Sequence, residues 1–555
     1  MHNLTCMNGA DERSEPTFLL PINGLDLDED LLVKAKNATA EEHTMSLRQA
    51  IKLYPTAVGW SMLLSLAIIM EGYDTLLLGS FYAFPAFVEK FGKLQPDGSY
   101  ELSAPWQAGL SNGATVGEII GLFLAGFCTE RYGYRKTMIS ALITLSAFIF
   151  ILFFAPIIQV LQVGYILCGI PWGIFQTITT SYAAEVCPIA LRGYLTSYVN
   201  LCWVIGQIIA SGILRGMLSI PNEWAYRGCY AIQWFWPIPI ITGVFFAPES
   251  PWWLVRRGRL DDAAKAIDRL TTKANPNVNT DQRVAMMMHT TDLERKLSEG
   301  ASFFDCFKGT NLRRTEIVIF VWVMQAFCGA ALMGYSTYFY EQAGLPTAQS
   351  FNLTLIQFGL GAVGTMISWV AMTYSGRRTL YLAGMCIMFI LLLTIGCVAV
   401  IPSAGKAGSW VIGSMLILFT FVYDCTVGPV CFSLVAEIPA TRLRSKSIVI
   451  ARNVYNAASI VNNIIVPYML NPTAWNWRGK AGFFWAGING LLTVRTFFRL
   501  PEPKGLAYSE LDVLFERKIG ARKFQTTAVD PFNIGTSACE TRNPVISMSE
   551  TVNQI

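Results

Sequence analysis

The sequence predicts an all-α membrane protein, with twelve transmembrane helices in two pseudo-symmetric halves of six. First, hydrophobic residues make up 53% of the 555 residues and charged residues only 14%, whereas a soluble globular chain is about a quarter charged. Second, twelve apolar runs are long enough to cross a hydrocarbon layer of about 30 Å, which takes about 20 residues. Third, a glutamate followed after six residues by an arginine ends an apolar run twice, as Glu185 to Arg192 and as Glu437 to Arg444. The repeat indicates two related halves.

The runs divide the chain into five regions. A polar tail (1–55) precedes the first half (56–247), a polar loop (248–314) joins it to the second half (315–500), and a second polar tail (501–555) follows. The expected spans are 57–85, 107–128, 138–158, 160–183, 196–214, 229–247, 317–340, 353–373, 379–401, 409–435, 447–470 and 481–500. Within the polar regions, LDDAAKAIDRL and SELDVLFERKI have apolar residues at helical spacing and predict amphipathic helices.

Basic residues gather in the loops on one side of these spans. Arg131, Arg135, Arg377 and Arg378 lie there, so the positive-inside rule makes this side, both tails and the central loop cytosolic. The first tail lacks the apolar core of a signal peptide.

Other function classes find little support. The net charge of +4 gives no indication of a nucleic-acid partner. The 13 cysteines have no metal or disulfide spacing. No polar segment is large enough for a catalytic domain, so we expect neither an enzyme nor a bound cofactor.

Charged residues inside the spans are the first candidates for function, because a charge at the membrane centre costs about 2.5–3.5 kcal/mol. Glu71 and Asp74 lie three residues apart and share a helix face, and two such close carboxylates can load and release a proton. Glu118 could share that proton, and Arg452 is the expected counter-ion. The other two are Asp424, which could satisfy backbone donors freed by a nearby proline, and Arg495, which could reach the membrane surface.

Four short motifs carry a resemblance to a known family. GFCTERYGYRK (126–136) and SGRR (375–378) resemble the loop motifs of the major facilitator superfamily. PESPWWL (248–254) and PEPKG (501–505) are similar to motifs of its sugar porter branch. Within that branch the sequence resembles the fungal maltose and α-glucoside proton symporters, through MEGYDT (70–75), GIPWGIFQT (169–177), NLCWVIGQ (200–207) and GYSTYFYEQAG (334–344).

The resemblance, which covers roughly residues 45–525, implies a major facilitator fold and a function. The expected function is import of an α-glucoside disaccharide such as maltose together with a proton, by alternating access. Asp74 matches the aspartate that carries the proton in related porters. Tyr165 stands where bacterial porters have an arginine, so Arg452 would serve as the counter-ion.

Amide and aromatic side chains inside the spans suit sugar hydroxyls and ring faces. Asn200, Gln207 and Gln325 match amide ligands of the family. Tyr335 and Asn456 are added as candidates because an aromatic ring and an amide suit a sugar. Gln176 and Trp203 are at least as well explained by helix packing. Two family amides are replaced by Ala326 and Ala331, and a family tryptophan by Phe432, which enlarges the site.

The loop motifs imply a gate on the cytosolic side, made of ion pairs that break and re-form as the halves rock. Its expected members are Glu130, Arg131, Arg135, Glu185, Arg192, Arg377, Arg378, Glu437 and Arg444. Thr373 replaces the acid of the second loop motif and cannot form an ion pair.

We expect a monomer in the plasma membrane. Two alternatives remain open: a carrier of the same fold for another sugar or a non-sugar metabolite, including an exporter, and a sugar sensor that does not transport. The second tail of about 55 residues is short for a sensor.

Overall fold

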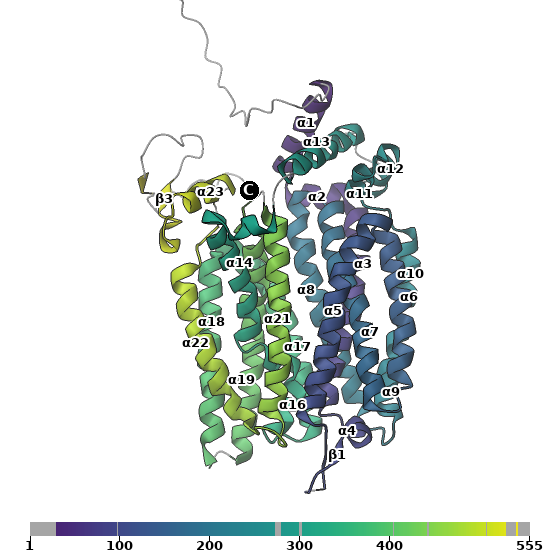
Figure 1. Cartoon of the computed structure of the whole chain (residues 1–555), viewed down its shortest axis with the longest axis vertical. Coiled ribbons are helices and arrows are strands. Elements are labelled where there is room, and N and C mark those ends of the chain that lie inside the picture. The colour runs from purple at the N-terminus through teal and green to yellow at the C-terminus, as the bar shows by residue number, and fades with distance from the viewer. Residues whose placement is uncertain are drawn as a thin grey trace, which may run out of the picture.

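The apolar runs form long α-helices that stand side by side in one bundle (Figure 1). The structure is a computed structural model that describes residues 29–96, 98–271, 279–298, 302–402, 405–440, 443–504, 506, 508–528 and 540–541. Each expected span lies on one long helix or on a broken helix.

The first half contains spans one to six. They are α3 (Pro55–Phe81), α5 (Ala104–Tyr132), α6 (Tyr134–Phe153), α7 (Ile158–Val186), α8 (Ile189–Met217) and a sixth span made of α9 (Trp224–Ile232), η1 (Gln233–Phe235) and α10 (Pro237–Phe246). The second half contains a seventh span made of α14 (Gly309–Phe327), α15 (Ala331–Gly334) and α16 (Ser336–Gln342). It continues with α17 (Thr347–Tyr374), α18 (Arg377–Val400), a tenth span made of α19 (Gly405–Cys425) and α20 (Val427–Glu437), α21 (Arg444–Leu470) and α22 (Ala481–Arg499).

Nine helices of the described chain are long and apolar enough to cross a membrane. The other expected spans are the seventh, the eleventh and the twelfth. The seventh is interrupted at Gly329, whose φ of +102° favours glycine, and the eleventh is α21, which carries Arg452 and several asparagines. The tenth span breaks before Pro429, because a proline cannot donate the backbone hydrogen bond that would continue the helix.

Glycines allow the second and fourth spans, α5 and α7, to pack closely. A Cβ on Gly117 would lie 2.1 Å from the carbonyl oxygen of Ile166, and a Cβ on Gly173 would lie 2.2 Å from that of Glu118. Only glycine fits at these crossings, which is the close approach that the small residues of the second span predicted.

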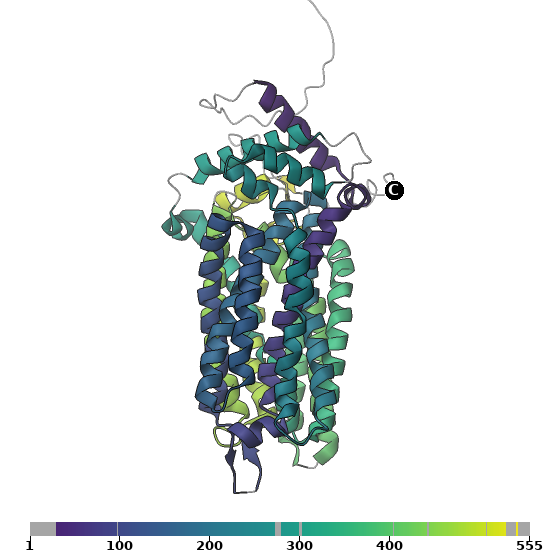
Figure 2. The same cartoon turned by 90° about the vertical axis from the view of Figure 1, so that its right-hand side faces the viewer.

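The two ends of the bundle differ, and we call them the tail side and the hairpin side. The tail side carries α1 (Glu29–Thr44), α2 (Leu47–Leu53), α11 (Pro251–Arg256), α12 (Leu260–Leu270), α13 (Thr280–Ser298), η2 (Phe303–Phe307), α23 (Tyr508–Glu516), η6 (Ala521–Lys523) and the strand pair β3 (Thr527–Ala528) with β4 (Glu540–Thr541). Figure 2 shows the central-loop helices lying across this end, with α1 beside them. The amphipathic helices expected in the polar regions are α12 and α23.

The hairpin side carries the loops of the opposite end. They include α4 (Pro85–Phe91), η5 (Arg478–Lys480) and an antiparallel pair of strands, β1 (Lys93–Leu94) and β2 (Tyr100–Glu101), in which Lys93 faces Glu101. Hydrogen bonds that join the two halves gather on this side. They connect Ser80 to Thr337 (3.1 Å), Ser111 to Tyr335 (2.8 Å), Glu101 to Tyr338 (2.5 Å) and the Leu102 carbonyl to Asn471 (2.7 Å).

Candidate functional site

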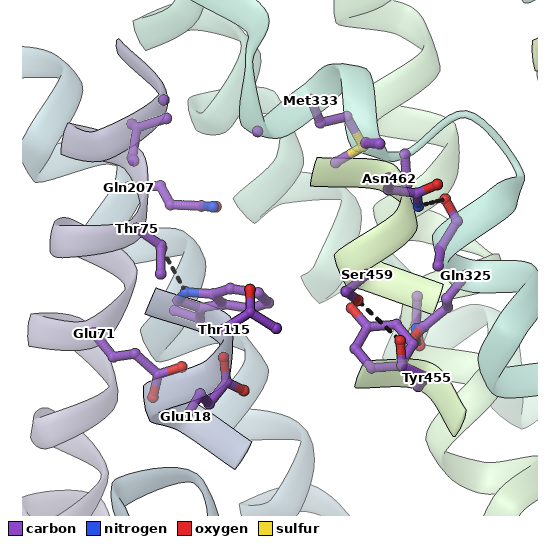
Figure 3. Close-up of a pocket in the computed structure, with 18 of the residues that line it drawn as sticks. Glu71, Thr75, Thr115, Glu118, Gln207, Gln325, Met333, Tyr455, Ser459 and Asn462 are labelled. Atoms are coloured by element: carbon purple, nitrogen blue, oxygen red, sulfur yellow. Dashed lines mark hydrogen bonds between the residues drawn. The ribbon is translucent and has the colours of Figure 1, made fainter. Parts of the chain in front are cut away.

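A cavity of about 330 Å³ lies between the two halves, near the middle of the bundle. Figure 3 shows Glu71, Thr75, Thr115, Glu118 and Gln207 of the first half on one wall. Across the gap lie residues of the second half: Gln325, Met333, Tyr455, Ser459 and Asn462. The volume of the cavity falls at the lower end of the range for small-molecule pockets, about 300–1,000 Å³.

The charged wall of the cavity is held together by Gln176. Its Nε2 donates a hydrogen bond to Glu71 (2.5 Å), and its Oε1 accepts one from the Arg452 guanidinium. Arg452 also lies 3.5 Å from a carboxylate oxygen of Glu118. A neutral amide thus connects an acid of the first half to a cation of the second. Glu71, Glu118 and Arg452, which the sequence connected as proton-sharing acids and their counter-ion, meet at one place.

Arg452 lies against two adjoining aromatic rings of its own half. Its guanidinium carbon lies 5.0 Å from the ring centres of both Trp322 and Tyr455. Such rings attract a guanidinium group through their faces, so they help to hold the Arg452 side chain at the cavity.

Asp74 lies behind this wall and does not line the cavity. Its carboxylate accepts a hydrogen bond from the indole N–H of Trp172 (3.1 Å), and it is 3% exposed. Trp172 and Gln176 are four residues apart on α7, so Glu71 and Asp74 both point to this helix, as their spacing predicted. A proton on Asp74 would therefore reach the cavity through neighbouring groups.

The surroundings of Asp424 differ from those that the sequence predicted. It lines the cavity, is 5% exposed, and forms no hydrogen bond or ion pair with another described residue. The prediction that it satisfies freed backbone donors of the broken helix therefore finds no support. A Cβ on Gly361 would lie only 2.5 Å from one carboxyl oxygen of Asp424, so a glycine of α17 makes room for this side chain.

All five predicted binding residues line the cavity: Asn200, Gln207, Gln325, Tyr335 and Asn456. Two of them already have protein partners. Gln325 donates to the Gly428 carbonyl (3.1 Å), and the Tyr335 hydroxyl donates to Ser111 (2.8 Å). Gln207 and Asn200 are partly exposed to the cavity.

The sequence did not indicate several lining residues of the second half: Asn463 donates to Thr115 across the two halves (3.0 Å), and Asn462 donates to the Ala326 carbonyl (2.8 Å). Trp203, for which helix packing was at least as good an interpretation, lines the cavity and donates to Thr75 (3.3 Å). The polar spacing of α21, which places Tyr455, Ser459, Asn462 and Asn463 on one face, was the available signal. Ala326, Ala331 and Phe432 line the cavity too, so the replaced family positions border the same space.

Glu185, an expected gate residue of the first half, has partners outside the predicted set. Its carboxylate accepts hydrogen bonds from the Tyr134 hydroxyl (2.9 Å) and from Ser250, and pairs with Arg256 (2.6 Å). The cation that the structure places beside Glu185 is thus Arg256. Arg192 lies on α8, with its side chain outside the described residues.

Of the other predicted members, Glu130 and Arg131 are exposed and Arg135 is partly buried. The Glu130 side chain is exposed, and its carbonyl accepts from Trp253 (3.0 Å) and Arg257 (2.5 Å). Arg131 lies over Tyr132, and Arg135 over Phe245.

In the second half the glutamate pairs with an arginine of its own loop motif, whereas Glu185 pairs with Arg256. Glu437 pairs with Arg377 (3.2 Å), and Arg378 donates to the Phe497 carbonyl (2.8 Å). Arg444 begins α21 and is partly buried. Thr373 donates to backbone carbonyls of its own helix instead of joining an ion pair.

A glutamate after the last span of each half, partly buried in the first half and buried in the second, holds the start of a helix. Glu249 accepts from the backbone N–H groups of Tyr134 (2.8 Å) and Arg135 (3.3 Å) at the start of α6. Glu502 accepts from those of Arg377 (2.8 Å) and Arg378 (2.9 Å) at the start of α18. A Cβ on Gly133 or Gly376 would collide with the respective carboxylate. The halves are therefore related in atomic detail as well as in sequence.

Comparison with known proteins agrees with this architecture. Residues 60–515 match the family model described as "Sugar (and other) transporter". The maltose permease MAL31 of Saccharomyces cerevisiae is 43% identical over 520 residues, which are 92% of this chain and 84% of the relative. The general α-glucoside permease of that yeast is 43% identical over 526 residues, 94% of this chain and 85% of the relative.

Solved structures show the same fold. The inward open conformation of the xylose transporter XylE from E. coli has a TM-score of 0.66 and 21% identity, over 82% of this chain and 99% of that one. The partially occluded inward open conformation has a TM-score of 0.65 and 20% identity, over 82% and 100%. The expected twelve-helix major facilitator fold is confirmed.

Proposed function

The chain belongs to the sugar transporter family of the major facilitator superfamily, and from this premise we propose that it imports an α-glucoside disaccharide such as maltose together with a proton. Its expected class, a transporter and not an enzyme, is that of the family. The substrate class follows the relatives that are 43% identical over most of both chains.

One observation supports the proposed proton coupling. Two acids of the first half, Glu71 and Glu118, share the cavity wall with Arg452 of the second half, and Gln176 bridges them. Protonation of Glu71 would remove the negative charge that orients Gln176 and would weaken the link between the halves. Each unit charge moved inward gains about 2.3 kcal/mol per 100 mV of membrane potential.

In this mechanism Asp74 and Glu71 load the proton, Glu118 shares it, and Arg452 is the counter-ion of the empty carrier. The sugar lies between Asn200 and Gln207 on one wall and Gln325, Tyr335 and Asn456 on the other. Ala326 and Ala331 leave room for a second sugar ring.

The tail side, in this proposal, faces the cytosol, and the protein is a monomer in the plasma membrane. Hydrogen bonds between the halves gather on the hairpin side, so the structure corresponds to a state closed to the exterior. Rocking of the halves would then break these bonds and bring together the surfaces around Glu185 and Glu437.

Uptake of labelled maltose, with external pH recorded, tests the proposal in cells that lack their own α-glucoside carriers. We expect sugar entry with alkalinisation of the medium, and loss of both with Asp74→Asn or Glu71→Gln. Glu223→Gln is the matched control, because Glu223 is an exposed acid of the hairpin side paired with Lys90. A surface-exposed protein without maltose uptake would contradict the substrate and favour another metabolite or sensing. Sugar entry without proton movement would contradict the coupling.

A further inference from the structure

We infer that the tail-side ends of α14 and α22 form a binding site for an anionic phospholipid headgroup of the adjacent leaflet. At this place a single carboxylate holds two arginines. Glu316 of α14 accepts from Arg495 and from Arg499 of α22, the latter at 2.9 Å. The three side chains carry a net charge of +1 and line a crevice with Phe320 and Leu500.

The guanidiniums retain donors for a ligand. Each has five N–H groups, and the structure shows only one nitrogen of each, Nη2, bonded to Glu316. The side chains of Arg495 and Arg499 are 40% and 54% exposed. Their planar groups suit the oxygens of a phosphate, which accept paired hydrogen bonds.

The surroundings point to a lipid as the source of that phosphate. The outer face of α22 exposes large apolar residues, Leu491, Val494 and Phe498, as a helix in contact with lipid does. Arg499 ends the helix, and Arg495 lies four residues earlier, about 6 Å deeper. The Arg495 guanidinium lies over the Phe320 ring, 3.7 Å from its centre, so it stands where hydrocarbon gives way to headgroups.

The crevice itself, about 20 Å³, cannot hold a headgroup. The phosphate would therefore sit over its mouth, with the acyl chains along the apolar face of α22. A third cation, Arg313, lies one turn before Glu316 and donates to the Ile519 carbonyl (2.8 Å). It adds positive charge to the same end. If the tail side is cytosolic, as proposed above, the site faces the leaflet that holds anionic lipids.

Native mass spectrometry of the full chain in detergent, titrated with phosphatidylserine or phosphatidylcholine, tests this inference apart from transport and from orientation. We expect phosphatidylserine to bind more tightly, and Arg495→Gln or Arg499→Gln to weaken it about fivefold, since one arginine near an anionic surface contributes about 1 kcal/mol. Arg259→Gln is the matched control, because Arg259 is an exposed arginine of the central loop paired with Asp262. It should bind the lipid as the wild type does.

The variant Glu316→Gln separates a lipid site from a structural ion pair. Removal of the competing carboxylate should tighten phosphatidylserine binding, whereas a purely structural cluster would be weakened by loss of any member. Weaker binding in Glu316→Gln, unchanged binding in Arg499→Gln, or equal binding of phosphatidylcholine would overturn the inference. Displacement of the lipid by inorganic phosphate alone would also overturn it, in favour of a soluble anion.

Discussion

At the scale of single residues, the sequence located the charges and a counter-ion but not the side chain that links them. Glu71, Glu118 and Arg452 could be found because a charge inside an apolar run is conspicuous. That Gln176 bridges them could not, since a span's neighbours are set by helix packing and not by its own composition. For the same reason the sequence could not indicate Arg256 of the central loop as a partner of Glu185.

Gln176→Leu should greatly reduce transport per molecule. The substitution keeps a similar volume but removes one donor to Glu71 and one acceptor for Arg452. A hydrogen bond to a charged group contributes about 1.5–3 kcal/mol, so we expect initial maltose uptake to fall at least about tenfold. The rates are measured at equal surface expression.

Gln162→Leu provides the control for this substitution. Gln162 is also an amide of α7, but it donates to the Gly109 carbonyl (2.8 Å) and does not line the cavity. Maltose uptake per molecule of the Gln162→Leu variant should stay near the wild-type value. Equal rates for the two variants would show that Gln176 serves only packing.

Asp424→Asn should weaken sugar binding more than it slows turnover. Asp424 lines the cavity without a described partner, so both of its carboxyl oxygens are available to sugar hydroxyls, whereas an amide has one oxygen. We expect the KM for maltose uptake to rise about fivefold, because one hydrogen bond contributes about 1 kcal/mol, while the maximal rate changes less. An unchanged KM would remove Asp424 from the sugar site.

At the scale of elements, the apolar runs predicted every span but not the interruption of the seventh. A run of apolar residues has the same composition whether the helix is straight or broken, and the turn at Gly329 depends on one left-handed residue. The packing of α1 against α13 also escaped prediction, since both helices lie in polar segments with weak periodicity.

Glu249→Ala and Glu502→Ala should destabilise the protein to a similar extent. Each carboxylate caps the first N–H groups of one helix, α6 or α18, and loss of a helix cap costs about 1 kcal/mol. The midpoint of thermal unfolding in detergent should fall in both variants. Glu516→Ala, at an exposed position of α23, should leave it unchanged. A fall in only one of the two would mean that the halves do not depend on these caps equally.

At the scale of the whole molecule, the two halves meet in an asymmetric way that the sequence does not encode locally. The repeated motifs show that the halves are related, and the caps at Glu249 and Glu502 show how closely. Which end is closed depends on weak contacts between surfaces distant in the chain, such as Asn471 with the Leu102 carbonyl. The sequence therefore predicts the two bodies but not their relative tilt.

A covalent link across the hairpin side should stop transport if that side opens in each cycle. Ser80 and Thr337 lie in opposite halves with their side-chain oxygens 3.1 Å apart, so a Ser80→Cys/Thr337→Cys double variant can form a disulfide under a mild oxidant. We expect maltose uptake to be lost on oxidation and restored by a reductant. The two single variants, given the same oxidant, show whether oxidation of the native cysteines affects uptake without the engineered link.

Thr337→Cys/Thr354→Cys is the matched control for this link. Thr337 and Thr354 are also hydrogen-bonded through their side chains, at 2.9 Å, but both belong to the second half. A link within one rigid half does not oppose rocking, so uptake should survive oxidation. If the cross-half pair is linked, as shown by mass spectrometry, and transport continues, the hairpin side does not open during the cycle. If both linked pairs stop transport, the second half does not move as one rigid body.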